Sequence, residues 1–309
     1  MTAGNRKIVV GTRGSELARA QARLVEEAIQ TVRPESKIET KIIATQGDKA
    51  RVIDPRAGRK GVFTAEIERA LLVGEVDVAV HSAKDLPSET SPDAEIAAVL
   101  ARAPMDDVLV SKHRGGLASL PQGATVATGS VRRKHQLLWK RPDLKLIDLR
   151  GNVPTRLRKL AENNWDAIVL ARAGLERLGL SASRIEICFE GGQFFLEILP
   201  CEIFLPAGGQ GIIAIQVRTD DQSTKALVGV VNDRETLLCL QAEREFLRGL
   251  QADCNCPVGV LAKIFNRKMR MRAQAFLGES AAPREAKVEG ACDEGGKLAG
   301  ELLRRITRE

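Results

Sequence analysis

The chain has 309 residues, of which 44% are hydrophobic and 28% are charged. These proportions exclude disordered, collagen-like and coiled-coil proteins, and the length predicts two or three domains. No window approaches the roughly 18 consecutive apolar residues of a membrane span, and residues 1–7 lack the apolar stretch of a secretory signal. The six cysteines all lie in the second half and are too few for a disulfide scaffold. We therefore expect reduced thiols, no membrane association and a cytoplasmic protein.

The formal net charge of +7 comes from one part of the chain. Nine basic residues and two acidic ones lie between Thr128 and Arg158, and the remaining charges cancel. Such a cluster can be a solvated face, a nucleic-acid or membrane surface, or a site for an acidic small molecule. Six of the nine are arginines, whose planar guanidinium pairs with carboxylate or phosphate through two hydrogen bonds. With ten aromatic residues and no Tyr, base stacking has little support, so nucleic acid is disfavoured.

The first 80 residues alternate strand and helix patterns. We expect strands over 7–11, 38–44 and 76–80, a helix capped by Ser15 that runs to Val32, a helix capped by Thr64 that ends at Gly74, and a long loop over 45–61. This order predicts a mostly parallel sheet with helices on both faces.

A second unit repeats the same pattern. Strands are predicted over 125–127, 145–149 and 167–171, with a helix that Ser130 caps and that runs through Lys140, and another that Thr155 caps and that runs to about Glu162. In both units the polar residues follow strands and begin helices, which is where ligands bind in open α/β sheets. Free N–H groups and the helix dipole favour anions there. Arg132, Arg133 and Arg150 therefore form a predicted anion site.

The remainder predicts a small α+β domain. It combines an amphipathic helix over 234–248, a polar turn with Cys254, strands over 258–264, 269–276 and 287–291, and a closing helix over 293–304.

Few residues stand out as candidates for chemistry. The three histidines are scattered without ligand spacing, so we expect no metal site, and no glycine-rich nucleotide motif follows a strand. Asp85 follows a buried strand and can be a functional carboxylate or a loop residue paired with Lys84. Cys254 lies in a polar turn, although a buried core thiol is the commoner role of a cysteine.

Several motifs together resemble one enzyme family. They are Thr12-Arg13-Gly14-Ser15-Glu16-Leu17-Ala18, Gly58-Arg59-Lys60-Gly61-Val62-Phe63, Val80-His81-Ser82-Ala83-Lys84-Asp85-Leu86-Pro87, Thr128-Gly129-Ser130-Val131-Arg132-Arg133, Leu149-Arg150-Gly151-Asn152-Val153-Pro154-Thr155-Arg156, Leu170-Ala171-Arg172-Ala173-Gly174-Leu175, Leu205-Pro206-Ala207-Gly208-Gly209-Gln210-Gly211 and Cys254-Asn255-Cys256-Pro257-Val258-Gly259. In this order they resemble the hydroxymethylbilane synthase family, also called porphobilinogen deaminases.

The resemblance implies an α/β fold of three domains. Two lobes like those of periplasmic binding proteins, with mixed, mostly parallel sheets, would enclose the active site, and a small α+β C-terminal domain would follow. The expected boundaries are 1–103 plus about 206–230 for the first lobe, 104–205 for the second and 231–309 for the third domain. The segment 185–205 looks roughly ten residues longer than is usual in the family.

The resemblance also implies a transferase of tetrapyrrole and heme biosynthesis that acts as a monomer. It would condense four porphobilinogen molecules head to tail onto a dipyrromethane primer, with loss of ammonia, and release linear hydroxymethylbilane by hydrolysis. The growing polypyrrole chain would be its only partner besides the substrate. A different class remains open, namely a two-lobed binding protein for acidic solutes without catalysis.

By resemblance, the site residues carry over individually. Cys254 would hold the dipyrromethane through a thioether, and Asp85 would be catalytic. Cofactor contacts fall on Lys84, Thr128, Ser130, Arg132 and Arg133, and substrate contacts on Arg13, Ser15, Gln21, Phe63, Arg150, Arg156 and Arg177. The basic loop over 45–61 would serve as a lid.

Overall fold

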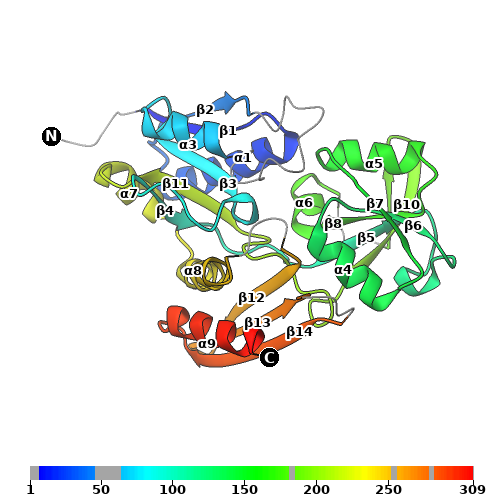
Figure 1. Cartoon of the computed structure of the whole chain (residues 1–309). Helices are drawn as coiled ribbons and strands as arrows, with labels where there is room; N and C mark the ends of the chain where they lie inside the picture. The colour runs from blue at the N-terminus through cyan, green and yellow to red at the C-terminus, as the bar shows by residue number, and fades with distance from the viewer. Residues whose placement is uncertain (1–6, 46–63, 181–184, 252–255, 278–281, 309) are drawn as a thin grey trace.

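The computed structural model describes residues 7–45, 64–180, 185–251, 256–277 and 282–308. Two lobes, each built on one sheet, lie side by side, and a third sheet lies beneath them (Figure 1). Three expectations fall outside the described residues: the site residues Phe63 and Cys254, and nearly all of the loop over 45–61.

Lobe 1 is built on a five-stranded sheet in the order β2-β1-β3-β11-β4, which we call sheet A. Its elements are β1 (Ile8–Arg13), α1 (Glu16–Val32), β2 (Ile38–Ile43), α3 (Ala65–Leu72), β3 (Val78–Ser82), β4 (Ala94–Val99), β11 (Ile213–Arg218) and α7 (Gln222–Gly229). Val25 and Ile29 of α1 pack on one face of the sheet with Val228 of α7. Ile67 and Leu71 of α3 pack on a second core with Ala79.

Lobe 2 is built on a six-stranded sheet in the order β7-β6-β8-β5-β10-β9, called sheet B. Its elements are β5 (Asp107–Ser111), β6 (Thr125–Ala127), α4 (Val131–Lys140), β7 (Lys145–Ile147), α5 (Val153–Glu162), β8 (Ala167–Ala171), α6 (Arg172–Arg177), β9 (Glu186–Phe189) and β10 (Gly192–Leu199). Leu157 of α5 and Leu175 of α6 share one core, whereas Leu137 of α4 belongs to another.

The two lobes share one plan, and the α/β fold class is confirmed. In each sheet three strands run parallel, β2-β1-β3 in sheet A and β7-β6-β8 in sheet B. The next strand, β11 or β5, is antiparallel to its neighbours. The sheets are therefore mixed, as expected, but parallel pairing is confined to one side of each. The prediction of mostly parallel sheets missed these strands because their partners lie far away in sequence.

The long segment near residue 190 forms a hairpin. Strands β9 and β10 pair antiparallel, with Glu190 and Gly191 in the left-handed region between them. Strand β10 occupies the place in sheet B that β4 occupies in sheet A, so β9 is an additional edge strand. The segment expected to be long for the family therefore forms the outer edge of sheet B.

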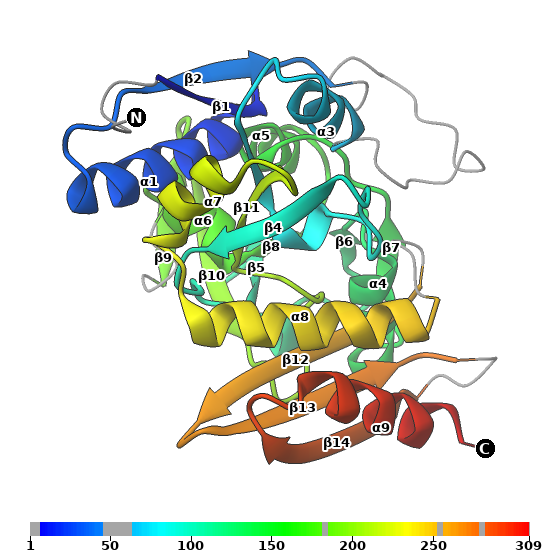
Figure 2. The same cartoon turned by 90° about the vertical axis from the view of Figure 1, so that its left-hand side faces the viewer.

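The third sheet, sheet C, has the order β12-β13-β14 and is antiparallel. It consists of β12 (Val258–Phe265), β13 (Lys268–Ala275) and β14 (Arg284–Ala291), and it packs with α8 (Arg234–Gly249) and α9 (Gly295–Thr307). Helix α8 crosses between lobe 1 and sheet C (Figure 2). Its Leu240 joins a core of lobe 1, whereas its Phe246 joins that of sheet C.

Helix starts agree with the sequence in two cases and differ in two. Ser15 accepts a hydrogen bond from Ala18 N, and Ser130 accepts one from Arg133 N, as capping residues do. The prediction that Thr155 caps a helix is wrong, because Asn152 is the N-cap and accepts from the N–H of Thr155 itself. Thr64 is at the N-cap position of α3, but its side chain makes no capping hydrogen bond.

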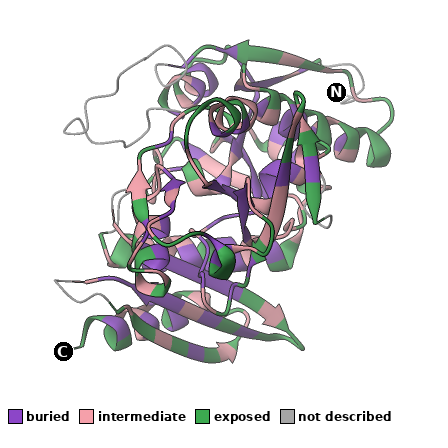
Figure 3. Ribbon diagram, turned by 90° about the vertical axis from the view of Figure 1, so that its right-hand side faces the viewer, coloured by how far each residue is buried: buried purple, intermediate pink, exposed green. Residues whose placement is uncertain are grey.

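The central strands of the two lobes are mostly buried, whereas exposed residues lie on the outer faces of helices, on the edge strand β2 and in loops (Figure 3). Within the described ranges, no helix is long and apolar enough to cross a membrane.

A buried ion pair holds lobe 1 to α8 and sheet C. Arg102, just after β4, donates to both carboxylate oxygens of Glu243 at 2.6 and 3.2 Å. Glu243 is fully buried and also accepts from Gly209 N at 2.6 Å and Ala262 N at 2.7 Å. Every acceptor direction of this carboxylate is therefore used, which is the condition under which a buried charge is tolerated.

Loss of this carboxylate is expected to destabilise the protein. In Glu243→Gln an amide N–H₂ replaces one acceptor, so a backbone N–H and the Arg102 charge lose their partner. Breaking a buried pair costs about 3–5 kcal/mol, so we expect the midpoint of thermal unfolding to fall by more than about 5 °C. Differential scanning calorimetry measures this. Glu245→Gln on the same helix, where Glu245 forms an exposed pair with Arg248, is the matched control and should change little. Equal midpoints for both variants would contradict the account.

Candidate functional site

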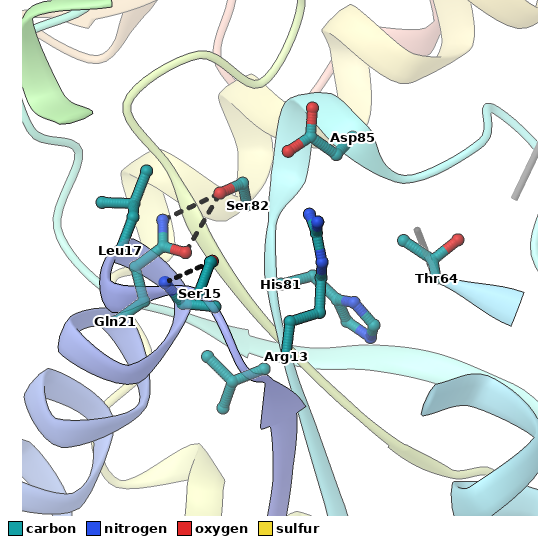
Figure 4. Close-up of a pocket in the computed structure, with 10 residues that line it drawn as sticks. Arg13, Ser15, Leu17, Gln21, Thr64, His81, Ser82 and Asp85 are labelled. Atoms are coloured by element: carbon teal, nitrogen blue, oxygen red, sulfur yellow. Dashed lines mark hydrogen bonds between the residues drawn. The ribbon is translucent and has the colours of Figure 1, made fainter. Parts of the chain in front are cut away.

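The carboxyl ends of β1 and β3 open into a small pocket of lobe 1 (Figure 4). Its volume is about 70 Å³, and it is lined by Arg13, Ser15, Leu17, Ala18, Gln21, Thr64, Val80, His81, Ser82 and Asp85. Four of the predicted site residues, Arg13, Ser15, Gln21 and Asp85, thus come together here from three elements.

Hydrogen bonds between α1 and the two strands fix the pocket wall. The amide of Gln21 donates to Ser82 Oγ at 2.9 Å, and Ser82 Oγ lies 3.1 Å from Gln21 Oε1. Thr12 Oγ1 donates to the carbonyl of Ala18 at 3.2 Å. Gln21 is almost fully buried, and its amide is hydrogen-bonded to Ser82. It therefore forms part of the pocket wall together with Arg13 and Ser15.

Lys84 and Asp85 lie on a short 3₁₀ turn, η1 (Ala83–Asp85), that follows β3. Asp85 is exposed at the pocket, and Lys84 is half-buried. Burial lowers the pKa of Lys84 to about 8, although Asp85 raises it, and the nearby Arg133 and Arg132 lower it further. The turn of lobe 1 therefore lies within electrostatic reach of the arginines of lobe 2.

Gly209 packs directly against this turn. Its φ is +74°, and a Cβ there would lie 3.0 Å from the backbone of Ala83 and Lys84. Only glycine combines this conformation with such a close approach.

The predicted anion site of lobe 2 has a carboxylate at its centre. Asp107, the first residue of β5, is 1% exposed. Its two oxygens pair with Arg132 Nη1 at 2.9 Å and Arg133 Nη2 at 2.7 Å. Burial alone would raise the pKa of Asp107, but the two guanidinium groups and a hydrogen bond from Gln210 hold it well below its ordinary value. Asp107 is therefore ionised and neutralises one of the two arginine charges.

Some, but not all, of the N–H donors of Arg132 and Arg133 form hydrogen bonds within the protein. Arg132 also donates to the Leu205 carbonyl at 2.8 Å, and Arg133 donates to the Val169 carbonyl at 2.8 Å. Both Nε atoms are buried and have no hydrogen-bond partner among the described residues. Two guanidinium groups with one counterion leave a net positive charge, which fits an acidic ligand.

Burial also lowers the pKa values of Arg156 and Arg177. Burial and the charge of Arg133 lower the pKa of Arg156 to about 10, while the opposing charge of Asp85 raises it. Burial likewise lowers the pKa of Arg177 to about 10, and its Nη2 donates to the Gly211 carbonyl at 2.6 Å. Arg156 thus lies within the field of Asp85, across the two lobes.

The other predicted contact residues of lobe 2, Thr128, Ser130 and Arg150, form hydrogen bonds with residues nearby in the chain. Thr128 is 1% exposed, and its Oγ1 accepts from Ser130 N at 3.3 Å, so both residues belong to the start of α4. Arg150 is half-buried, and its carbonyl accepts from Lys159 at 3.1 Å.

Several basic residues of the cluster between residues 128 and 158 form ion pairs with acidic side chains. Lys134 pairs with Asp148, Arg141 with Asp143, and Arg158 with Glu190. These three basic residues are therefore paired with acidic neighbours and do not belong to the anion site predicted from Arg132, Arg133 and Arg150. Arg132, Arg133 and Arg156 have the electrostatic links to the turn of lobe 1.

Sequence reasoning missed Asp107, His81 and Gln210. Two adjacent arginines predicted to be at a buried helix start demand a counterion, but nothing local identifies Asp107 among the 40 acidic residues. His81 lies within a quoted motif and is 4% exposed in the pocket wall. Gln210 donates to Asp107 Oδ1 at 2.9 Å from the chain segment that returns to lobe 1.

Comparisons with known proteins agree along the chain. Residues 8–226 match the family model described as porphobilinogen deaminase, dipyromethane cofactor binding domain, and residues 237–305 match the porphobilinogen deaminase C-terminal domain. A porphobilinogen deaminase of Syntrophomonas wolfei is 45% identical over 270 residues, which are 86% of this chain and 84% of that protein. One of Pelotomaculum thermopropionicum is 41% identical over 319 residues, 98% of each chain. Since both family models describe the same family and near-full-length relatives exceed 40% identity, the chain belongs to the porphobilinogen deaminase family.

Proposed function

We propose that this protein is a hydroxymethylbilane synthase, a transferase that condenses four porphobilinogen molecules and releases hydroxymethylbilane with water. Each addition forms one carbon–carbon bond between pyrrole units and expels one ammonia, and the final step consumes one water. The observation that carries the proposal is the exposed Asp85 carboxylate beside a pocket and within the field of Lys84 and Arg156. A binding site for acids alone has no need of a carboxylate there.

The cations would hold the substrate's carboxylates. Porphobilinogen has an acetate and a propionate side chain, and Arg13 and Ser15 line the pocket of lobe 1. Arg150, Arg156 and Arg177 complete the proposed substrate contacts. Guanidinium groups bind carboxylates through charge-assisted hydrogen bonds and keep several acidic groups together without large repulsion.

Asp85 would act on the reacting pyrrole. Loss of ammonia leaves a cationic pyrrole, and a carboxylate aimed at its ring N–H stabilises the charge as it develops. The same carboxylate can take up the proton released when the new bond forms.

The family model for residues 8–226 is that of the dipyrromethane cofactor binding domain. When bound, this group supplies the pyrrole carbon on which the chain grows. We propose that Cys254 holds it through a thioether, and that Lys84, Thr128, Ser130, Arg132 and Arg133 hold its carboxylates. The net positive charge that Arg132 and Arg133 keep beside the single Asp107 carboxylate supports this assignment.

The proposal keeps three expectations from the sequence: a monomer, a cytoplasmic location, and domain boundaries at 1–103 plus 206–230, 104–205 and 231–309. Support for the boundaries comes from β11, which pairs with β3 and β4, and from α7, whose Val228 packs into lobe 1.

The covalent cofactor predicts a mass change. Under denaturing conditions, the intact mass of protein purified from its source or an expression host should exceed the sequence mass by two pyrrole units. Cys254→Ser should have the sequence mass, because the thioether cannot form. The neighbouring Cys256→Ser is the matched control and should retain the added mass. A wild-type protein that is fully active at its sequence mass would contradict the assignment.

The role of Asp85 separates the enzyme from a binding protein. Asp85→Asn keeps the shape and removes the negative charge, so we expect kcat to fall by roughly 10²–10³-fold while the protein remains folded. Asp93→Asn, at an exposed loop position of lobe 1, is the control and should turn over normally. If porphobilinogen binds but no variant and no wild-type protein releases ammonia, the two-lobed binding protein is the correct alternative.

The lowered pKa of Lys84 predicts a pH dependence. Its ammonium is charged below about pH 8 and neutral above it, and only the charged form attracts a carboxylate. We therefore expect the fraction of cofactor-free protein that takes up the dipyrromethane, measured by intact mass, to fall as the pH rises through about 8. Lys84→Arg stays charged throughout, so it should lack this decline. A decline that persists unchanged in Lys84→Arg would assign it to another group.

A further inference from the structure

His81 is a buried titratable residue in the pocket wall that the proposed mechanism does not use. It lies on β3, three residues before Lys84, and is 4% exposed. In Figure 4 the side chain of Arg13 passes beside the His81 ring and points towards Asp85. His81 is therefore placed to act on Arg13.

A polar chain lies behind His81, between sheet A and α3. His81 is opposite Ala214 on β11, so Gln216, two residues further along that strand, lies on the same face of the sheet. Gln216 is fully buried, and its Nε2 donates to Glu68 Oε2 of α3 at 2.9 Å. Helix α3 also begins beside Thr64, another residue of the pocket wall. His81 and Gln216 thus share one face of sheet A, and Gln216 in turn is bonded to Glu68 of α3. His81 Nε2 and Gln216 Oε1 are buried and have no hydrogen-bond partner among the described residues.

The surroundings keep the imidazole neutral. Burial lowers the pKa of His81 to about 4, and the charge of Arg13 lowers it further, while Gln216 opposes the effect. A neutral imidazole has one N–H donor and one acceptor nitrogen. With the proton on the nitrogen that faces Gln216, the other nitrogen is an acceptor, and a guanidinium has only donors.

We propose that His81 is a positioning residue: its neutral ring, oriented from behind by Gln216 and Glu68, holds the Arg13 guanidinium towards a carboxylate of the substrate in the pocket. This inference rests on the proposed function for the identity of the substrate. The proposed hydrogen bond between His81 and Arg13 concerns the protein alone and can be tested separately.

The first test is a double-mutant cycle with porphobilinogen as substrate. His81→Phe keeps a ring and removes both nitrogens, and Arg13→Leu removes the guanidinium. We expect His81→Phe to raise KM about tenfold and change kcat less than about threefold, because it weakens binding through Arg13. In the Arg13→Leu background the same substitution should have no further effect. His113→Phe, which removes the ring paired with Asp166 in lobe 2, is the matched control.

Two outcomes would overturn the inference. One is that the effects of His81→Phe and Arg13→Leu on KM multiply, which means that the residues act independently. The other is that His81→Phe lowers kcat and leaves KM unchanged. If His81→Phe fails to fold, Glu68→Gln provides a second route, because it removes the charge that anchors Gln216. It should raise KM in the same direction by a smaller factor, and an unchanged KM would count against the inference.

Imidazole NMR tests the contact without turnover. The chain has only three histidines, so the signals of His81 are identified by their loss in His81→Phe or by elimination with the other two. We expect these signals to shift in Arg13→Leu, and signals identical to those of the wild type would contradict the contact. A wild-type protein without turnover would refute the proposed function and leave this measurement valid.

Discussion

The neutralisation of a buried carboxylate by two adjacent arginines is the interaction on which the anion site of lobe 2 depends. Asp107 pairs with Arg132 and Arg133, which lie in the first turn of helix α4. Two guanidinium groups at consecutive positions would repel each other and lose their hydration if buried alone. One carboxylate between them, with one backbone carbonyl accepting from each arginine, allows both to be buried and still leaves one net positive charge.

Asp107 is also joined to the second buried ion pair of the molecule. Gln210 donates from its side chain to Asp107 and accepts at its carbonyl from Arg102 Nε at 2.9 Å. Arg102 in turn pairs with Glu243 of α8, whose carboxylate accepts from Gly209 N. A continuous buried network therefore runs from the arginines of lobe 2, through both connections between the lobes, to the helix that holds sheet C. Because Gly209 also packs against the turn of Lys84 and Asp85, the network orients the site from both sides.

Much of this could be predicted from the sequence, and the reasons for the rest are physical. Local patterns predicted α1, α4 and α8 and the strands that precede pocket residues, because periodicity and capping act over a few residues. Strands β5 and β11 were not predicted, since each is held by partners far away in the chain. Likewise the sequence indicated an excess of arginines but could not show that Asp107 is their counterion or that Lys134 and Arg158 are paired elsewhere. His81 was within a recognised motif, yet only burial beside Arg13 distinguishes it from an ordinary core histidine.

The proposed function requires that this protein condenses porphobilinogen and does not merely bind acids. The most direct test is the stoichiometry of the wild-type protein incubated with porphobilinogen, with ammonia and linear tetrapyrrole measured in the same sample. The account predicts four ammonia molecules for each hydroxymethylbilane released, since each of the four additions expels one. Porphobilinogen that is bound and recovered intact, with no ammonia formed, would contradict it.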